Sequence, residues 1–523
     1  MSADFSTLES MCELIVDCPH STPKWTDSGV IVLRNQNIKN GVLDLSSPSY
    51  TNEKDYEKRV KRAVPKVGDI VFTREAPMGD VCKIPSDLRC CLGQRQVLLR
   101  PKLDISGDYL FWSLQSPQVQ EQISWNEGTG STVSNVRIPV LKALNIPRLD
   151  SLTSEVKTAK ILSDLAQKIQ LNRQINQTLE SMAQAIFQSW FVDFDPVKAK
   201  IAAREQWQIL TDDERTEWLN ELLDTQDYFK TCLLELTAKA GLNDDENVQL
   251  DSSLDLISCR GHGPESSENL DIGFNNLRKE WQSKKVGPAL QSASETLYLN
   301  IAAMTAISSR NETSLADMPA DEFSQLYKTA SLFPERLVDS ELGEMPEGWS
   351  VQKLEDIIEL AYGKALKKTD RIEGGVPVYG SGGVTGNNNE SLVEGPGIIV
   401  GRKGTVGSLY WEDQSFFPID TVFYVKTKPD ITLLYVYYLL QMLGLENMNT
   451  DAAVPGLNRN NVYRLAIVKP PESLIFNFSE MVSSFRKEIF INQKAIQSLE
   501  AVRDSILPKL VSGELDMTFK FDS

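Results

Sequence analysis

The chain has 523 residues, of which 41% are hydrophobic and 24% charged, an ordinary soluble composition with room for about three domains. It contains no run of 18 apolar residues and no basic, apolar leader at its start, so we expect a cytoplasmic protein without a membrane span or export signal. Seven cysteines do not indicate a disulfide framework, and two histidines without zinc-type cysteine spacing argue against a metal site and against histidine catalysis.

The net charge of −18 is distributed unevenly along the chain. Residues 198–345 hold 27 acidic and 14 basic side chains, a net charge of −13, whereas residues 1–152 hold 18 of each. Contact with DNA depends on where charge lies and not on the total. The acidic total therefore does not exclude nucleic-acid binding by the N-terminal part.

Residues 1–150 are predicted to form a sheet-rich domain. Short apolar runs bounded by Gly, Pro and Asp turns predict strands at residues 30–33, 69–73 and 96–99, and a helix is expected over residues 109–123.

A basic stretch in this domain carries four cations near Tyr56: Lys58, Arg59, Lys61 and Arg62. Two interpretations stay open, a solvated helix face with i,i+4 pairs and an edge that contacts phosphates. Further along, Gln94 and Arg95 offer the amide and guanidinium groups that read adenine and guanine edges in a major groove.

A long helix is predicted within residues 151–195. No Gly or Pro occurs from residue 153 to 191, and the helix ends before Pro196. Apolar residues recur with the 3–4 spacing of a helix-packing seam, at Ile161, Leu165, Ile175, Leu179, Met182 and Ile186. Lys168 and Asn172 interrupt this seam, as polar residues do where they fix the register of two helices.

Residues 196–340 have no counterpart elsewhere in the chain and read as an acidic insertion. We expect helices at residues 209–236 and 292–307 and a loop at 243–268. The pair Asp212-Asp213 fits a solvated first helical turn better than acid–base chemistry.

Residues 341–475 are predicted to form a second sheet-rich domain, with strands at residues 376–379, 397–400 and 421–425. Its basic cluster consists of Lys364, Lys367, Lys368 and Arg371. The Gly-rich segment 380–386 lacks the Gly-Lys-Ser/Thr of a phosphate-binding loop, so we interpret it as tight turns that present Asn387 and its neighbours.

A second long helix is predicted over residues 476–515, capped by Asn477 with Glu480 and ended by Pro508 and Gly513. It matches the first helix at an offset of 320, with Asn492 in place of Asn172 and an identical Leu at 499 and Ile at 506. The seam residues expected in it are Phe485, Asn492, Leu499 and Ile506.

Three segments before each helix also repeat in the same order. Residues 130–136 match 451–457 at an offset of 321, residues 109–115 match 435–441 at 326, and residues 70–79 match 398–407 at 328. The last pair places Arg74 opposite Arg402-Lys403, which makes all three candidate DNA contacts. The chain is therefore predicted to be a duplicated α+β protein. Two similar sheet-rich domains would be joined by two long antiparallel helices, with pseudo-two-fold symmetry.

Motifs for methyl transfer, nucleotide hydrolysis and nuclease activity are absent from the sequence. We infer a DNA-sequence reader without catalytic residues, against two alternatives. One is a stand-alone DNA-modifying enzyme, and the other is a coiled-coil interaction protein without a DNA role.

The chain resembles the specificity (S) subunit of Type I restriction-modification enzymes over nearly its whole length. The segments that carry the resemblance are LESMAQAIFQSWFVDFDP at 179–196, SELGEMPEGW at 340–349, PVYGSGG at 377–383, IVGRKGTVG at 399–407, PIDT at 418–421 and LPKLVSGEL at 507–515.

The resemblance implies that residues 1–150 and 341–475 are target-recognition domains for the two halves of a split double-stranded DNA site. The helices would then be a spacer that sets the unread gap and binds two modification (methyltransferase) subunits. Restriction subunits would join the complex. S-adenosylmethionine, ATP and Mg would be used by these partners, with no cofactor on this chain.

Overall fold

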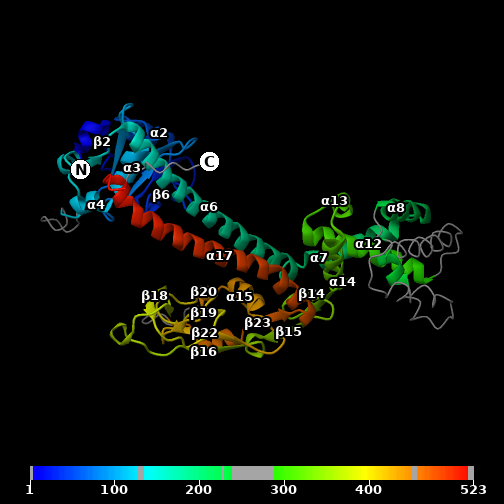
Figure 1. The fold of residues 1–523 in the computed structure, drawn as a ribbon. Helices are drawn as coiled ribbons and strands as arrows, with labels where there is room; N and C mark the ends of the chain where they lie inside the picture. Colours follow the sequence, from blue (N-terminus) through cyan, green and yellow to red (C-terminus); the bar gives the residue numbers. More distant parts are fainter. Residues whose placement is uncertain are drawn as a thin grey trace. The chain divides into compact units, whose positions relative to one another are not determined.

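The computed structural model describes residues 4–125, 135–225, 229, 231–237, 288–448 and 456–515 (Figure 1). The chain divides into two compact units: the first unit, Met1–Asn176 with Ile491–Ser523, and the second unit, Gln177–Phe490. Two 40-residue helices, α6 (Leu152–Phe191) and α17 (Glu472–Val511), contribute one part to each unit.

The first unit is built on a four-stranded antiparallel sheet. Its strand order is β2 (Cys12–Asp17), β11 (Gln96–Pro101), β8 (Ile70–Thr73) and β9 (Val81–Lys83). The central strand β8 is buried along its whole length, as its apolar run requires. A second sheet has the order β10 (Cys90–Leu92), β4 (Val30–Leu33), β7 (Ser49–Thr51) and β3 (Trp25–Thr26). Two-stranded pairs are formed by β1 (Asp4–Thr7) with β12 (Asn145–Arg148) and by β5 (Ile38–Lys39) with β6 (Val42–Leu43).

The first unit also contains short helices. They are α1 (Leu8–Met11), η1 (Asn35–Asn37), α2 (Glu53–Arg59), α3 (Gly107–Gln115), α4 (Pro117–Ser124) and α5 (Ile138–Lys142). The single helix expected over residues 109–123 is two helices, because Ser116 is extended and Pro117 begins α4. Proline disfavours the helical conformation in the residue before it, which explains the break.

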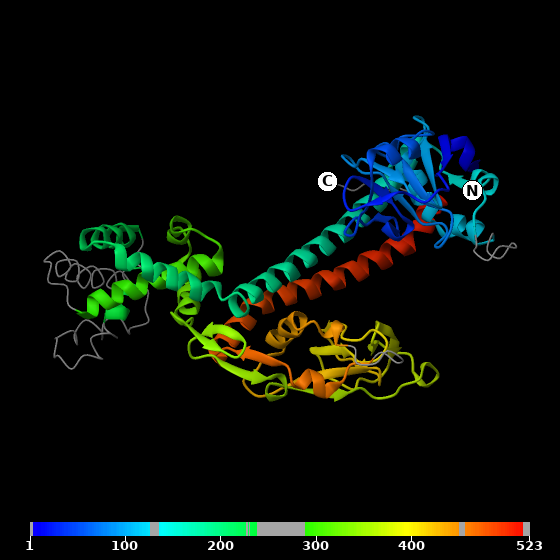
Figure 2. The same ribbon diagram turned by 180° about the vertical axis from the view of Figure 1, so that it is seen from behind.

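Within the first unit, α6 and α17 lie side by side and antiparallel (Figures 1 and 2). Leu507 and Leu510 of α17 share one core with Ala159 and Leu162 of α6. Further along, Arg173 of α6 pairs with Glu500 of α17. The order of these contacts is opposite in the two helices, which makes them antiparallel.

The second unit repeats the main sheet of the first unit with the order β16 (Ile358–Tyr362), β22 (Val422–Thr427), β19 (Gly397–Gly401) and β20 (Leu409–Glu412). A three-stranded sheet contains β18 (Gly383–Asn388), β17 (Val376–Gly380) and β21 (Phe417–Pro418). Paired strands are β13 (Leu337–Ser340) with β14 (Gly343–Pro346) and β15 (Ser350–Lys353) with β23 (Ala466–Lys469). The short helices are η2 (Leu354–Asp356), η3 (Lys368–Asp370), α15 (Leu433–Met442), η4 (Leu445–Asn447) and α16 (Arg459–Tyr463).

The two units have the same internal plan, which confirms the duplication. Helices α3 and α15 are capped alike, since the Ser106 and Thr432 side chains accept from the amides of Tyr109 and Tyr435. Along the helix pair, residues 171–180 and residues 491–500 share one pattern of burial, residue for residue. The fold class is the predicted mixture of helix and sheet with two sheet-rich domains and long helices.

The buried seam of the helices is one step away from the predicted one. Asn172 and Asn492 are buried as expected. The buried apolar positions include Leu162, Ile169, Ala183 and Phe187 in α6 and Phe478, Val482, Ile489, Leu507 and Leu510 in α17. The predicted seam residues are half-buried flanks, namely Ile161, Leu165, Ile175, Leu179, Ile186, Phe485, Leu499 and Ile506. Met182 is exposed, so the prediction was wrong for it.

The ends of α17 also differ from the prediction. The helix begins at Glu472, directly after Pro471, and Asn477 lies inside it with its side chain on the Ser473 carbonyl. Proline is compatible with the start of a helix, because the first amide groups of a helix have no hydrogen-bond partner within it. Pro508 is accommodated in the last turns, and the helix ends before Gly513, which has the positive φ of a terminating glycine.

The segment between the second part of α6 and β13 forms a helical bundle with its own core. Its helices are α7 (Asp195–Ile209), α8 (Asp212–Thr225), α12 (Pro288–Ser308), α13 (Glu312–Ala316) and α14 (Ala320–Ser331). Pro196 starts α7, and the helix predicted at 292–307 lies within α12. The loop predicted at 243–268 lies outside the described residues.

One buried lysine links the start of this segment to its end. Lys200 is buried, and its Nζ donates to the Phe333 carbonyl at 2.7 Å. Burial lowers the pKa of Lys200 to about 8, because an apolar environment disfavours the charged form.

None of the helices in the described ranges is both long and apolar enough to cross a membrane.

Candidate nucleic-acid interface

The duplicated arginines occupy the same place in the backbone of each unit. The amide of Arg74, directly after β8, donates to the Arg95 carbonyl at 2.8 Å, and that of Arg402, after β19, donates to the Thr421 carbonyl at 2.9 Å. Their carbonyls accept from Val136 and Leu457, respectively. Arg74 and Arg402, at the predicted offset of 328, are therefore structurally equivalent, and so are Val136 and Leu457, at 321. The rest of the segments predicted to repeat at 321, residues 130–134 and 451–455, lies outside the described residues.

The turn after each arginine is also shared. Gly79 donates to the Thr73 carbonyl at 2.9 Å, and Gly407 donates to the Gly401 carbonyl at 2.8 Å. Both glycines have positive φ, of 93° and 72°. A side chain is strained in this conformation, which explains why glycine ends both repeated segments.

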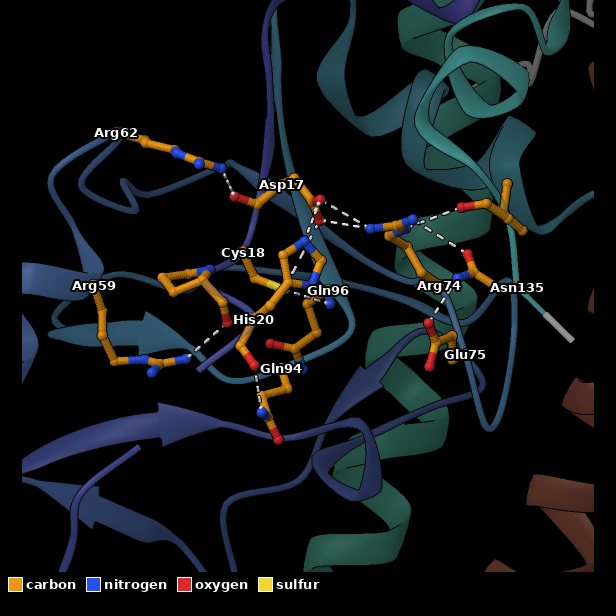
Figure 3. A network of polar contacts seen from close by, with 12 residues as sticks. Asp17, Cys18, His20, Arg59, Arg62, Arg74, Glu75, Gln94, Gln96 and Asn135 are labelled. Atoms are coloured by element: carbon orange, nitrogen blue, oxygen red, sulfur yellow. Dashed lines mark hydrogen bonds and ion pairs between the residues drawn. The ribbon is translucent and has the colours of Figure 1, made fainter. Parts of the chain in front are cut away.

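The Arg74 side chain is buried inside the first unit (Figure 3). Its Nη1 donates to both carboxylate oxygens of Asp17 at 2.8 and 2.9 Å, and its Nε donates to the Val136 carbonyl at 2.9 Å. Its Nη2 donates to Asn135 Oδ1 at 3.2 Å. The guanidinium is thus neutralised and hydrogen-bonded within the protein. The structure therefore places Arg74 in the interior of the first unit, and its contact with DNA stays a prediction.

Arg59 is also an internal residue rather than part of an exposed stripe. Its guanidinium donates to the carbonyls of Leu92, Gly93 and Ser21, each at 3.0 Å. A buried guanidinium that donates to several backbone carbonyls at once serves the fold, because buried polar groups need hydrogen-bond partners. The other three cations of that stretch, Lys58, Lys61 and Arg62, are exposed.

Gln94 (Figure 3) and its neighbour Arg95 both make local contacts. Gln94 Nε2 donates to the His20 carbonyl at 2.7 Å. Arg95 has a positive φ of 67°, and its half-exposed side chain pairs with Glu75 at 3.2 Å. The amide and guanidinium groups predicted to read bases are therefore at the surface, but they are held by neighbouring groups.

In the second unit, Arg402 has a different environment. Its Cζ lies 4.9 Å from the centroid of the Tyr362 ring, within cation–π range, and its Nη1 donates to the Asp420 carbonyl at 3.0 Å. A second guanidinium, that of Arg459, lies 5.1 Å from the same ring. Arg402 and Arg459 are half-buried, and Tyr362 is 49% exposed. We call these three residues the Tyr362 cluster.

Sequence reasoning missed Tyr362 and Arg459. In the sheets, Tyr362 is opposite Phe423, and Asp17 is opposite Val97. Val97 follows the residue opposite Thr73, and Phe423 follows the residue opposite Gly401. Thr73 and Gly401 match at the offset of 328, so Asp17 and Tyr362 are also equivalent, at an offset of 345. This offset lies outside the range of the repeated segments, and the two residues differ in chemistry. Only strand pairing brings them into register.

The remaining candidates of the second unit are distributed over its surface. Lys364, Lys367, Lys368, Asn387 and Lys403 are exposed, and Arg371 is half-buried. Arg371 Nη1 donates to the Thr385 carbonyl at 2.8 Å, so this arginine supports β18. Asn388 is buried and caps backbone groups of Ile372 and Glu390, in contrast to its neighbour Asn387.

Metal or thiol chemistry finds no support among the described residues. They contain no group of three or more His, Cys, Asp or Glu side chains able to hold a metal ion. Burial raises the pKa of Cys12, Cys82 and Cys90 to about 12, which keeps these thiols protonated and unreactive at neutral pH.

Fold and surface together define a class of protein. It is a duplicated protein in which each unit joins one sheet-rich module to part of a long antiparallel helix pair. The model of the Type I restriction modification DNA specificity domain matches residues 4–181 and 346–500. The chain belongs to this family. The helical bundle lies almost wholly between the two matched regions.

Two curated relatives extend over most of the chain. One is the Type I restriction enzyme HindI specificity subunit of Haemophilus influenzae, 24% identical over 501 residues and covering 89% of this chain and 90% of the relative. The other is the MjaIX specificity subunit of Methanocaldococcus jannaschii, 24% identical over 474 residues and covering 88% and 81%. Among solved structures, a Type I S subunit from M. genitalium is 15% identical, covers 97% of this chain and 96% of its own, and has a TM-score of 0.46.

Proposed function

We propose that this chain is the subunit that gives a Type I restriction-modification complex its DNA sequence specificity. The observation that carries the proposal is the duplication of one sheet-rich module within a chain of the specificity family. Two modules of like topology suit a bipartite target, each module reading one half. The subunit is non-catalytic, as the family is, and the catalytic activities sit in methyltransferase and restriction partners.

The proposal is tested by mapping methylated sites. The chain is produced with a modification subunit in a host without other methylation, and the methylated sequence is read from the host DNA. Exchanging residues 346–468 for the matching module of a relative is expected to change one half of the split target and leave the other half unchanged. A target that changes in both halves or in neither contradicts the proposal. Methyl transfer by the purified chain alone would favour a stand-alone enzyme.

We further propose that each long helix presents an equivalent surface to one of two modification subunits. Leu152 of α6 is 46% exposed and has no apolar counterpart in α17, where Glu472 stands at the same offset. Apart from Leu152, each helix exposes three large apolar side chains, each 46–52% exposed. They are Val156, Leu171 and Met182 in α6 and Phe476, Ile491 and Val502 in α17. Every pair has the same offset of 320. Exposed apolar side chains that recur at matched positions support a repeated docking surface, because solvent exposure alone would not preserve them in register.

Replacing Leu171 and Met182 by Gln is expected to remove one modification subunit, and replacing Ile491 and Val502 by Gln the other. All four side chains are exposed, so the stability of the chain should change by less than about 0.5 kcal/mol per substitution. Native mass spectrometry of the assembled complex counts the bound subunits. The matched control replaces the exposed Lys168 and Glu488 by Ala, which should leave two bound. Two subunits on either Gln variant would disprove the assignment.

A further inference from the structure

The duplicated arginine is neutralised in one unit and not in the other. In both units the arginine side chain packs against the last residue of an outer strand of the main sheet. This residue is Asp17 in β2 and Tyr362 in β16. Asp17 supplies a full negative charge to Arg74. Tyr362 supplies only the negative face of its ring to Arg402, which is a much weaker attraction.

The Tyr362 cluster concentrates positive charge at a partly exposed place. Two guanidinium groups lie about 5 Å from one ring centroid, and neither forms an ion pair with a carboxylate among the described residues. Arg402 uses one donor on the Asp420 carbonyl, and its other N–H groups make no hydrogen bond within the described part of the chain. Exposed Lys364 and Lys403 are close to Tyr362 and Arg402 in the chain.

Such an arrangement favours an anion as the missing partner. Two cations that share one ring concentrate positive charge at this place, and a bound anion would balance it. Guanidinium groups match phosphate oxygens with two parallel N–H donors, and their charge releases counterions from DNA. A phosphodiester is therefore the ligand that the charge and donor geometry fit.

We propose that Arg402 and Arg459, held on Tyr362, contact the backbone phosphates of the target duplex, and that the described part of the first unit has no counterpart of this site. The inference rests on the proposed function, since it takes duplex DNA as the ligand. The two units would then hold DNA through different residues although their folds match. Phosphate contacts position a protein on DNA without reading the sequence. The cluster would thus affect affinity and leave the recognised sequence unchanged.

The test measures the salt dependence of binding by the complex of the full chain with its modification subunits. Fluorescence anisotropy follows a duplex that contains the mapped target over a series of salt concentrations. Each lost phosphate contact lowers the slope of log K against log salt by about 0.9. The double variant R402A/R459A is expected to lower it by about 1 to 2 and to weaken binding to target and non-target DNA alike. R402K/R459K should retain most of the slope, because the charges remain.

A matched control lies in the same sheet. Lys426 of β22 lies 5.8 Å from the Tyr424 ring, but it is also paired with Glu359 at 3.4 Å. K426A removes a cation that is already paired with a carboxylate, so its slope should equal that of the wild type. Thermal unfolding reports whether R402A/R459A remains folded. If it does not, R402Q/R459Q, which keeps polar side chains of similar reach, is judged by the same slope.

The outcomes separate this inference from the proposed function. A wild-type slope in the folded double variant, with target-selective binding by the wild type, overturns the inference alone. A wild-type complex that does not prefer its mapped target overturns the proposed function. A reduced slope with an unchanged methylated sequence supports both.

Discussion

Replacing Arg74 by alanine is expected to destabilise the first unit by about 3 kcal/mol, the lower end of the loss seen when one partner of a buried ion pair is removed. The substitution leaves the largely buried Asp17 carboxylate without its guanidinium and leaves the Val136 carbonyl without the Nε donor. Arg74→Lys should rescue little, because an ammonium cannot reproduce the fork that reaches Asp17, Val136 and Asn135 together.

The measurement is urea unfolding combined with hydrogen exchange at amides of the first unit, such as Val97 and Val136. The matched control is Arg402→Ala, the same substitution at the equivalent position of the second unit. Arg402 is half-exposed and has no carboxylate partner within the described residues, so its loss should cost less than about 1 kcal/mol. Equal losses for the two variants would contradict the assignment of Arg74 to the interior.

Phe187→Ala is expected to destabilise the second unit by about 4 kcal/mol, the usual cost of removing a fully buried phenyl ring. Phe187 is 1% exposed and lies on α6, where its ring centroid is 5.1–5.6 Å from those of Phe191, Tyr435 and Phe478. These rings come from α6, α15 and α17. The cavity would therefore loosen the attachment of the sheet-rich module to its part of the helix pair.

Phe476→Ala is the matched control for this prediction. Phe476 lies in the same unit on α17, but it is 52% exposed, so its removal should change the free energy of unfolding by at most about 0.5 kcal/mol. Chemical unfolding of both variants checks the difference. A loss of several kcal/mol for Phe476→Ala would contradict its exposed position and weaken the case for a docking surface on α17.

The duplication and the class of the protein could be predicted without coordinates. Repeated segments at offsets of 320 to 328 depend only on the order of side chains, and the described residues of these segments lie at equivalent positions of the two units. Helix lengths were also predictable, because nearly 40 residues without Gly or Pro and with helical apolar spacing have few other ways to bury their apolar side chains. The ends of α17 were not predictable, because the effect of a proline depends on its place. Pro471 precedes the helix, whereas Pro508 lies inside its last turns.

The seam and the candidate contacts required the tertiary structure. In α6, apolar residues flank the buried line on both sides, so spacing alone does not show whether Ile161 or Leu162 faces the partner helix. Arg74 and Arg402 match in sequence, yet one is neutralised by Asp17 and the other rests on Tyr362.

The order of residues along the chain is thus enough to reveal the duplication, because the repeated segments can be recognised in the sequence itself. The availability of a charge to a ligand is different. It depends on which side chain from a distant strand lies beside it, and only folding brings those two together.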